Sequence, residues 1–263
     1  MNLENLCYQA IDTIKSTGDF IRRENRKLHT NDVQTKGHHD YVTYVDKTAE
    51  RLLTAGLLKL LPGSGFITEE DTIKDQRESY TWIIDPLDGT TNYIHSVPVY
   101  SISVALQYNE KTVIGIVYEI SRDECFYAWQ DSPAYLNNSP VHVSKTSSLD
   151  EALLATGFPY YDYSRISAYM EFFVYLLQNT RGIRRLGSAA VDLAYVACGR
   201  FDGFYEYSLH AWDVAAGAFL VQQAGGKVCD FKGGADYLFG AEIIATNNSI
   251  HKTLKSALQR QFN

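Results

Sequence analysis

Apolar residues recur at intervals of three and four positions near the N-terminus, at Leu3, Leu6, Cys7, Ala10, Ile11 and Ile14. This spacing places them on one face of a helix, so it predicts an amphipathic helix at the start of the chain. A second helix is predicted over residues 46–61, where an inner apolar stripe ends at Pro62-Gly63. Residues 28–39 are polar and predict a mobile hairpin or loop.

Shorter apolar runs predict strands in the rest of the first half, over residues 65–67, 82–84, 100–108, 112–120 and 124–129. The last three strands are joined by turn sequences at Asn109-Glu110 and at residues 121–123, which is typical of an antiparallel meander. We therefore expect the first half to pack helices on an antiparallel sheet.

From about residue 150 the pattern changes to strands and helices in alternation. Strands are predicted over residues 152–155, 183–186, 202–207 and 241–245, and helices over 164–178, from 189, over 213–224 and from 249. An α+β first half is thus followed by an α/β second half, with no internal repeat and no linker between them. We predict a single unit over residues 1–263 with an N-terminal half at 1–149 and a C-terminal half at 150–263.

Composition and charge narrow the class of protein. Hydrophobic residues make up 45% of the 263 residues and charged residues 21%, as in ordinary soluble globular proteins. The formal net charge of −7 argues against a broad nucleic-acid-binding face, because such faces gather Lys and Arg. No apolar stretch is long enough to cross a bilayer, so we expect no contact with a membrane.

The N-terminus and the cysteines indicate the compartment. The first residues lack the basic and apolar regions of a signal peptide. Cys7, Cys125, Cys198 and Cys229 form no CxxC pair, which argues against a zinc or dithiol motif and favours free thiols in a reducing environment. We expect a cytoplasmic protein.

Candidate chemistry is concentrated in the run Trp82-Ile83-Ile84-Asp85-Pro86-Leu87-Asp88-Gly89-Thr90-Thr91-Asn92. An apolar strand here leads into two carboxylates, Asp85 and Asp88, which are hard oxygen ligands of the kind that Mg²⁺ prefers. The turn that follows offers backbone N–H groups and hydroxyls to an anion. The alternative interpretation is an ordinary tight turn, because Asp, Pro and Gly cluster in loops.

Other carboxylates occupy comparable places. Glu69 and Glu70 follow a predicted strand, and Asp213 lies at the start of a predicted helix. If they converge with Asp85 and Asp88, their repulsion requires divalent cations, and oxygen-only ligands favour Mg²⁺ over zinc. Taken singly, the glutamates would form a solvated acidic loop and Asp213 a helix N-cap.

Three blocks in chain order carry a family resemblance: Phe66-Ile67-Thr68-Glu69-Glu70, the run from Trp82 to Tyr93, and Trp212-Asp213-Val214-Ala215-Ala216-Gly217. With Gly187-Ser188-Ala189-Ala190 and Asp202-Gly203-Phe204-Tyr205-Glu206 between them, they resemble the inositol monophosphatase family of Mg²⁺-dependent, lithium-sensitive sugar and inositol phosphatases. The resemblance implies a layered αβαβα sandwich of the inositol monophosphatase and fructose-1,6-bisphosphatase type, and a homodimer. Thr68 stands where the family usually has a glycine, and both carboxylates remain.

The resemblance implies two to three Mg²⁺ ions in each site. Glu69, Asp85 and the carbonyl oxygen of Leu87 would hold the first ion. Asp85, Asp88 and Asp213 would hold the second, and a third, weaker ion would lie near Glu69. Most of these ligands come from the N-terminal half.

The implied reaction is attack of a metal-activated water on a phosphomonoester. The implied catalytic residues are Glu69, Thr90 and Asp46, and Thr90 with Asp46 as its hydrogen-bond partner would orient the water. The N–H groups of Gly89 and Thr90 would hold phosphate oxygens.

Positions that match the substrate-binding residues of the family are Asp88, Gly89, Thr90, Ser188, Ala189, Glu206 and Asp213. Glu206 and the Ser188-Ala189 turn would contact ring hydroxyls, which gives the C-terminal half the task of binding the alcohol. The alternative for Glu206 is an exposed strand end. Lys36 matches a residue on a mobile loop near the metals, and its alternative is a solvated loop lysine.

Other polar and aromatic residues gave weaker signals. His38 and His39 are adjacent in a polar loop, where histidines are commonly solvated, and we leave them out of the site. Tyr160, Tyr161 and Tyr163 would rim the pocket or a dimer contact. Arg184 and Arg185 would flank a strand.

The function implied by the resemblance is hydrolysis of inositol 1-phosphate to inositol and phosphate. Alternatives on the same scaffold are phosphatases for histidinol phosphate, fructose 1,6-bisphosphate or 3′-phosphoadenosine 5′-phosphate. The last often carries Lys after Asp-Gly-Thr, where this chain has Thr91, which favours inositol-type substrates. A hypothesis of another class is a regulatory partner of the transcription machinery on a retained phosphatase scaffold.

Overall fold

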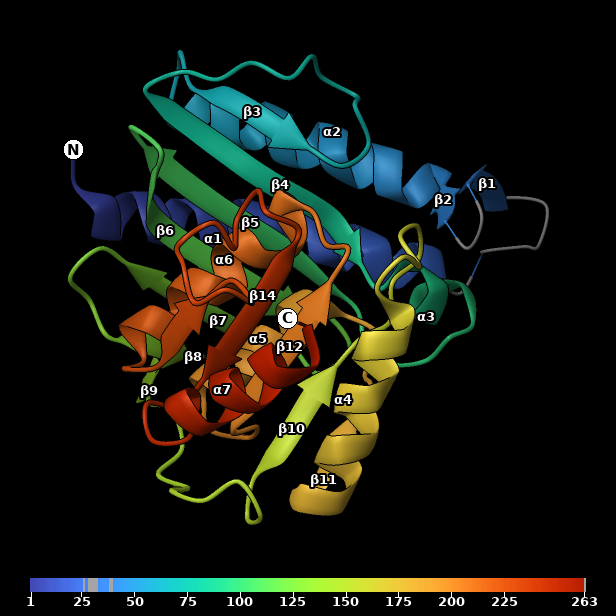
Figure 1. Cartoon of the computed structure of the whole chain (residues 1–263). Coiled ribbons are helices and arrows are strands. Elements are labelled where there is room, and N and C mark those ends of the chain that lie inside the picture. The colour runs from blue at the N-terminus through green and yellow to red at the C-terminus, as the bar shows by residue number, and fades with distance from the viewer. Residues whose placement is uncertain (26, 28–32, 38–39, 263) are drawn as a thin grey trace.

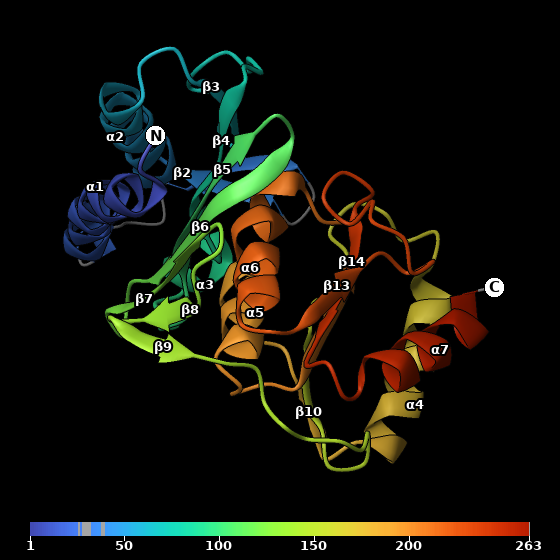
Figure 2. The ribbon, with the colours of Figure 1, turned by 90° about the vertical axis from the view of Figure 1, so that its left-hand side faces the viewer.

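The computed structural model of the chain describes residues 1–25, 27, 33–37 and 40–262. These residues form two main β-sheets that alternate with three layers of helices (Figures 1 and 2). The outer pair α1 (Leu3–Asn25) and α2 (Tyr44–Leu60) covers the first sheet, α5 (Ala189–Ala197) and α6 (Ala211–Gln223) lie between the sheets, and α4 (Ile166–Asn179) and α7 (His251–Phe262) cover the second sheet. The predicted αβαβα sandwich is confirmed.

The first sheet has the strand order β3-β4-β5-β6-β7-β8-β9. Its strands are β3 (Gly65–Thr68), β4 (Tyr80–Asp88), β5 (Ser101–Tyr108), β6 (Lys111–Glu119), β7 (Glu124–Trp129), β8 (Ala134–Leu136) and β9 (Ser139–Val141). All neighbours from β4 onward are antiparallel, as the meander predicted, but β3 and β4 are parallel. The prediction of a purely antiparallel sheet was therefore wrong at this pair, and both strands end at the same edge of the sheet.

The second sheet has the order β11-β10-β12-β14-β13. Its strands are β10 (Leu153–Thr156), β11 (Gly182–Arg184), β12 (Gly203–Tyr207), β13 (Lys227–Cys229) and β14 (Glu242–Thr246). Strand β10 is parallel to both of its neighbours, whereas β14 is antiparallel to β12 and β13. This mixed sheet agrees with the alternation of strands and helices that the sequence predicts for the second half.

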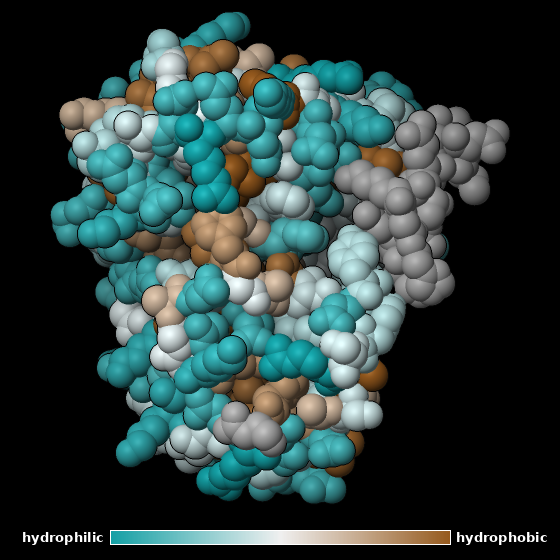
Figure 3. Space-filling view, turned by 45° about the horizontal axis from the view of Figure 1, so that its top comes forward, coloured by the Kyte–Doolittle hydropathy of each residue, from teal (hydrophilic) through white to brown (hydrophobic). Residues whose placement is uncertain are grey.

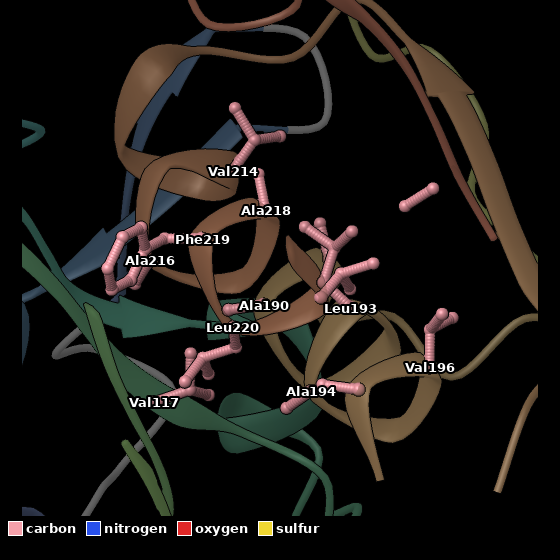
Figure 4. Packing of buried hydrophobic residues seen from close by; sticks show 14 of the residues in the cluster. Val117, Ala190, Leu193, Ala194, Val196, Val214, Ala216, Ala218, Phe219 and Leu220 are labelled. Carbon is pink, nitrogen blue, oxygen red and sulfur yellow. The ribbon is translucent and has the colours of Figure 1, made fainter. Parts of the chain in front are cut away.

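Helices α5 and α6 approach each other closely because they are rich in small residues (Figure 4). A Cβ atom at Gly217 of α6 would lie only 2.5 Å from the Cβ of Leu193 in α5. Both helices are buried among apolar side chains from the two sheets, including Val117 of the first and Phe204 of the second. The middle layer therefore holds the two sheets at a fixed separation.

Helix α2 begins two residues earlier than predicted because of a capping box. The Thr43 hydroxyl oxygen accepts from the Val45 N–H at 3.0 Å, and the Asp46 carboxylate accepts from the Thr43 N–H at 2.8 Å. This box fixes Asp46 in the first turn of the helix, where it is buried.

Short elements were missed because three to five residues are too few to show a period. They are helix α3 (Thr90–Ile94) and strands β8, β9 and β13. Strands β1 (Val33–Gly37) and β2 (Asp40–Thr43) pair as an antiparallel hairpin. The β1–β2 hairpin agrees with the hairpin predicted within residues 28–39. His38 and His39 lie outside the described residues.

The hydrophilic surface and the free cysteines are as expected for a globular protein of this composition. The face shown in Figure 3 is mostly hydrophilic, with hydrophobic residues scattered in small groups. Cys7, Cys125, Cys198 and Cys229 are free thiols, as predicted. Within the described ranges, every helix is too short or too polar to cross a membrane.

Candidate active site

Strand β4 ends in a bulge that presents two carboxylates. Its pairing with β5 shifts register between Asp85 and Asp88, which turns both side chains away from the regular alternation. Asp85 is buried and accepts a hydrogen bond from the Leu87 N–H at 2.9 Å. The Asp-Pro-Leu-Asp sequence thus forms a local loop that keeps one carboxylate oxygen tied to the backbone.

Gly89 joins this loop to α3 in a left-handed conformation, with φ of 93°. A Cβ atom here would lie 3.0 Å from the Val99 carbonyl oxygen and 3.2 Å from that of Gly187. The position therefore favours glycine for its backbone angle and for the available space. Figure 1 shows the end of β4 running into α3 at this point.

Glu69 comes to Asp85 through the parallel pairing of β3 and β4. Thr68 of β3 pairs with Ile84 of β4. The residues that follow this pair along the two chain segments are Glu69 and Asp85. Glu50, which is buried in α2, holds the loop after β3 by accepting from the N–H groups of Glu70 and Thr72, each at 2.7 Å. Glu50 was missed by sequence reasoning, and the one available signal was an acidic residue next to the inner apolar stripe of its helix.

The hydroxyl group of Thr90, a residue of the pocket lining, has two hydrogen-bond acceptors within the protein. The predicted hydrogen bond is present, since Thr90 Oγ1 lies 3.1 Å from Asp46 Oδ1, and the Leu87 carbonyl oxygen is a second acceptor at 3.0 Å. Burial raises the pKa of Asp46, and hydrogen bonds from Thr43 oppose that rise. The hydroxyl proton of Thr90 is therefore directed inward, and its oxygen remains an acceptor.

Asp88 ties the first half of the chain to the second. Its Oδ2 accepts from Ser188 Oγ at 2.6 Å and from the Ala190 N–H at 2.7 Å, at the start of α5. A helix start is a favourable place for a carboxylate because the first N–H groups lack partners within the helix. Asn92 adds a second link, since its side-chain amide donates to the carbonyl oxygens of Val99 and Leu186, both at 2.8 Å.

Asp213 lies in the first turn of α6. The N-cap of α6 is His210 and not Asp213, but Asp213 completes a capping box, because its Oδ2 accepts from the His210 N–H at 2.6 Å. The same side chain also lines the pocket that Asp88 borders. A role in the capping box and a role in the site are therefore compatible.

Glu206 is buried in β12, with 6% of its surface exposed, so the alternative of an exposed strand end is wrong. Its carboxyl group lies against the Cα of Gly157, and a Cβ atom at position 157 would overlap both of its oxygens. Gly157 directly follows β10 and was missed by sequence reasoning, because a glycine after a strand resembles any loop start.

These residues surround one pocket of about 120 Å³. Both halves of the chain line it, with Glu69, Asp85, Leu87, Asp88, Gly89, Thr90 and Thr91 from the first, and Gly157, Tyr160, Tyr161, Arg185, Gly187, Ser188, Ala189, Asp192, Glu206, Ser208, Leu209, His210, Trp212 and Asp213 from the second. Most of the site residues expected from the sequence line this pocket. Asp46 does not line it but reaches it through Thr90, and Glu70 is buried outside it rather than solvated. The side chain of Lys36 lies outside the described part of the chain. Tyr160, Tyr161 and Arg185 line the pocket, whereas Tyr163 and Arg184 do not.

The carboxyl groups raise one another's pKa. Burial raises the pKa of Asp85 well above its usual value, and the charges of Glu69, Asp88 and Asp213 and a hydrogen bond between the Asp85 and Glu69 carboxyl groups add to this. Burial raises the pKa of Asp88 to about 6 against the hydrogen bonds from Ser188 and Ala190. It raises the pKa of Asp213 to about 7, with the charge of Asp88 adding to it. This pocket therefore favours positive charge.

The donor set fits divalent cations that prefer oxygen. Within the described ranges, no three acidic, histidine or cysteine side chains already surround one point as a preformed metal cage. Burial and the charges of Glu69, Asp88 and Asp213 raise the pKa of Asp85, and bound cations would offset this repulsion. Carboxylate oxygens and the Leu87 carbonyl are ligands suited to Mg²⁺.

Similar proteins are known in sequence and in structure. The model of the inositol monophosphatase family matches residues 2–262 of the chain. The Nus factor SuhB of Pseudomonas aeruginosa is 41% identical over 255 residues, which cover 95% of this chain and 94% of that protein. The inositol-1-monophosphatase of Rhizobium meliloti is 38% identical over 251 residues, with 95% and 94% covered. The crystal structure of the extragenic suppressor protein suhB of Bartonella henselae has a TM-score of 0.90 at 38% identity and 99% coverage of both chains.

Proposed function

Since the chain belongs to the inositol monophosphatase family, we propose that it is a Mg²⁺-dependent phosphomonoesterase that hydrolyses inositol 1-phosphate to inositol and phosphate. The observation that carries this proposal is the convergence of Glu69, Asp85, Asp88 and Asp213 on one pocket beside the Gly89-Thr90 turn. The chain acts as a single catalytic unit, with residues 1–149 supplying most metal ligands and 150–263 most contacts to the alcohol.

Two to three Mg²⁺ ions would occupy the site. Glu69, Asp85 and the Leu87 carbonyl oxygen would hold one ion, and Asp85, Asp88 and Asp213 a second, so Asp85 would serve both. Such ions lower the pKa of water and neutralise charge on a phosphate and its leaving oxygen. The raised pKa values of Asp88 and Asp213 are consistent with carboxylates arranged for cations.

Thr90 orients the attacking water. Because its hydroxyl proton is directed at Asp46 or at the Leu87 carbonyl, its oxygen is available to accept a hydrogen bond from water. A water held in this way directs a lone pair toward the phosphorus atom. Asp46 acts through Thr90 and does not touch the substrate.

The phosphate lies over the first turn of α3. N–H groups at the start of a helix have no partner within the helix, so those of Gly89 and Thr90 are available for phosphate oxygens. Phosphoryl transfer requires mainly positioning and charge stabilisation, which amides and cations supply together.

The alcohol half lies against the C-terminal half of the chain. Glu206, Ser188 and Ala189 line the pocket on this side and offer acceptors and backbone groups to hydroxyls. Asp88 and Asp213 border the same space. A carboxylate such as Glu206 suits a polyol because it accepts hydrogen bonds from two hydroxyls.

The test is release of phosphate from inositol 1-phosphate, histidinol phosphate, fructose 1,6-bisphosphate and 3′-phosphoadenosine 5′-phosphate, with Mg²⁺ and with a chelator. We expect release only with Mg²⁺, and the highest kcat/KM for inositol 1-phosphate. A different preferred substrate would keep the metal chemistry and reassign the Glu206 side of the pocket. Absence of release from all four would reject the phosphatase.

The name of one relative favours a second candidate function. The Nus factor SuhB of Pseudomonas aeruginosa is 41% identical to this chain, which supports a role as a partner of the transcription machinery. Direct binding of the purified chain to RNA polymerase with its elongation factors tests this role. The Asp88→Asn variant should bind equally well if partnership is independent of catalysis.

We also propose that the chain forms a homodimer through α4. One face of this helix exposes Met170, Val174 and Leu177, and Phe158 lies exposed nearby in sequence. Exposed apolar residues at helical spacing are typical of a surface that another protein covers.

A further inference from the structure

Asp192 is a buried acidic residue in the wall of the pocket. It lies in the first turn of α5, where its N–H donates to the Ser188 carbonyl oxygen at 3.0 Å. Only 1% of its surface is exposed, and it is one of the residues that line the pocket. Its Oδ1 atom is buried and has no hydrogen-bond partner among the described residues.

The charged residues around Asp192 do not form an ion pair with its carboxyl group. Glu206 and Asp88 lie near enough to repel it, and Arg185 is the cation that opposes them. The Arg185 guanidinium donates to the Tyr160 hydroxyl oxygen at 2.6 Å rather than forming an ion pair with Asp192. Asp192 therefore faces the pocket as an acceptor with unused capacity.

A stabilising role at the helix start does not explain this burial. An acidic residue benefits from the helix dipole equally well when it is exposed, and Ser188 already caps α5 by accepting from the Val191 N–H. A buried polar atom without a partner is costly, whereas a ligand that supplies a donor removes that cost. The unmatched oxygen in the pocket therefore indicates a ligand with hydroxyl or amine donors.

Glu206 is a second buried acidic residue of the same pocket. Its carboxyl group is pressed against Gly157 and lines the same pocket, so two carboxyl groups face the alcohol side of the site. Two acceptors within one pocket suit an alcohol with several hydroxyls and do not suit an alkyl or aryl group. The metals and the phosphate need neither of them.

We propose that Asp192 is a specificity-determining residue that, together with Glu206, accepts hydrogen bonds from hydroxyls of a polyol on the alcohol side of the substrate. This inference rests on the proposed phosphatase function. It adds Asp192 to the residues that distinguish a polyol phosphate from other phosphomonoesters.

The test compares two substrates that share the phosphate and differ in the alcohol. Inositol 1-phosphate carries ring hydroxyls, and 4-nitrophenyl phosphate carries none. For Asp192→Asn we expect KM for inositol 1-phosphate to rise about tenfold or more, because one of the two acceptor oxygens becomes an NH₂ group that cannot accept from a substrate hydroxyl. The kcat for inositol 1-phosphate and both constants for 4-nitrophenyl phosphate should change less than about threefold.

Asp150→Asn is the matched control, because Asp150 is exposed and lies outside the pocket lining. It makes the same chemical change and should leave all constants as in the wild type. If Asp192→Asn fails to fold, as judged by circular dichroism, Asp192→Ser replaces it, since a smaller polar side chain relieves the crowding of carboxyl groups.

Equal losses on both substrates would overturn the proposal, because Asp192 would then serve the chemistry or the integrity of the site. Unchanged constants on both would overturn it too. If the wild type releases no phosphate from either substrate, the proposed function fails, and calorimetric binding of free inositol to the wild type and to Asp192→Asn decides the inference. Equal binding to both proteins would reject it, and weaker binding to the variant would support it.

Discussion

Glu69, which directly follows β3, and Asp85 of the parallel strand β4 stand one register step beyond the pair Thr68 and Ile84. Asp85 is buried, and its burial and the charge of Glu69 raise the pKa of its carboxyl group. A strand pair that delivers two acids to one point is unfavourable without positive charge. The parallel pairing of β3 with β4, in a sheet that is antiparallel from β4 onward, brings these two residues side by side.

Asp88→Asn should abolish turnover without unfolding the protein. The variant loses a charged ligand, so we expect kcat/KM to fall by about a thousandfold, since bound metals contribute several kcal/mol. Its remaining side-chain oxygen still accepts from Ser188 and Ala190, so circular dichroism and the metal-free Tm should stay near those of the wild type. Mg²⁺ should raise the Tm of the wild type more than that of the variant. Asp12→Asn, an exposed change on α1, is the control, and an active Asp88→Asn enzyme would contradict the metal assignment.

Gly157→Ala should impair substrate affinity as Glu206→Ala does. The added Cβ overlaps the Glu206 carboxyl group, which must move out of its place in the pocket. We expect both variants to raise KM for inositol 1-phosphate about tenfold and to change kcat much less. Steady-state kinetics with inositol 1-phosphate and 4-nitrophenyl phosphate measure this. A Gly157→Ala enzyme with wild-type KM would show that the Glu206 position is not set by this contact.

The sequence predicted the elements that are long and periodic. Helices α1 and α2 and the β5–β7 meander were found because their apolar residues repeat over many positions. The acids near strand ends could be assigned a candidate chemistry because their order matches that of a family. The parallel pairing of β3 with β4 was not predicted, because nothing local in either strand records which way its neighbour runs.

The residues that sequence reasoning missed act through burial in three dimensions. Glu50, Gly157 and Asp192 stand in a helix, after a strand and in a helix start, where their types are common. Their roles come from what lies across from them, namely the Glu70 loop, the Glu206 carboxyl group and the pocket. No spacing along the chain encodes these distances.

Gly217→Val should destabilise the fold without changing the site. The new Cβ would lie 2.5 Å from the Cβ of Leu193, and neither helix backbone can yield without moving a sheet. Overpacking of this kind costs about 1–3 kcal/mol, which urea denaturation measures. Gly182→Val is the control, because the nearest atom to a Cβ there, at 3.3 Å, belongs to the flexible Arg184 side chain. Equal stability of the two variants would mean that α5 and α6 can separate freely.

His251 should make the protein sensitive to acid. Burial lowers the pKa of His251, and the charges of Lys255 and Lys227 lower it further, so the folded state holds the ring neutral. The unfolded chain takes up a proton as the pH falls through about 6.5, and the folded chain does so only at lower pH, so stability is lost over that window. The raised pKa values of Asp88 and Asp213 act in the opposite direction over this window, so the expected result is a comparison. From pH 7.5 to 5.5 the Tm of the wild type should fall relative to the Tm of His251→Gln. Parallel Tm curves for both proteins would contradict this, because other groups would then cause the whole loss.

Leu177→Asp should convert the proposed dimer into a monomer. Leu177 is 54% exposed on α4, in line with Val174 and Met170, so an aspartate there would place a charge in an apolar interface. Leu58→Asp on α2 is the control, because Leu58 is 40% exposed on the opposite side of the layered fold. Size-exclusion chromatography with light scattering should give a dimer for the wild type and Leu58→Asp and a monomer for Leu177→Asp. A wild-type monomer would reject the dimer, and a dimeric Leu177→Asp variant would move the interface away from α4.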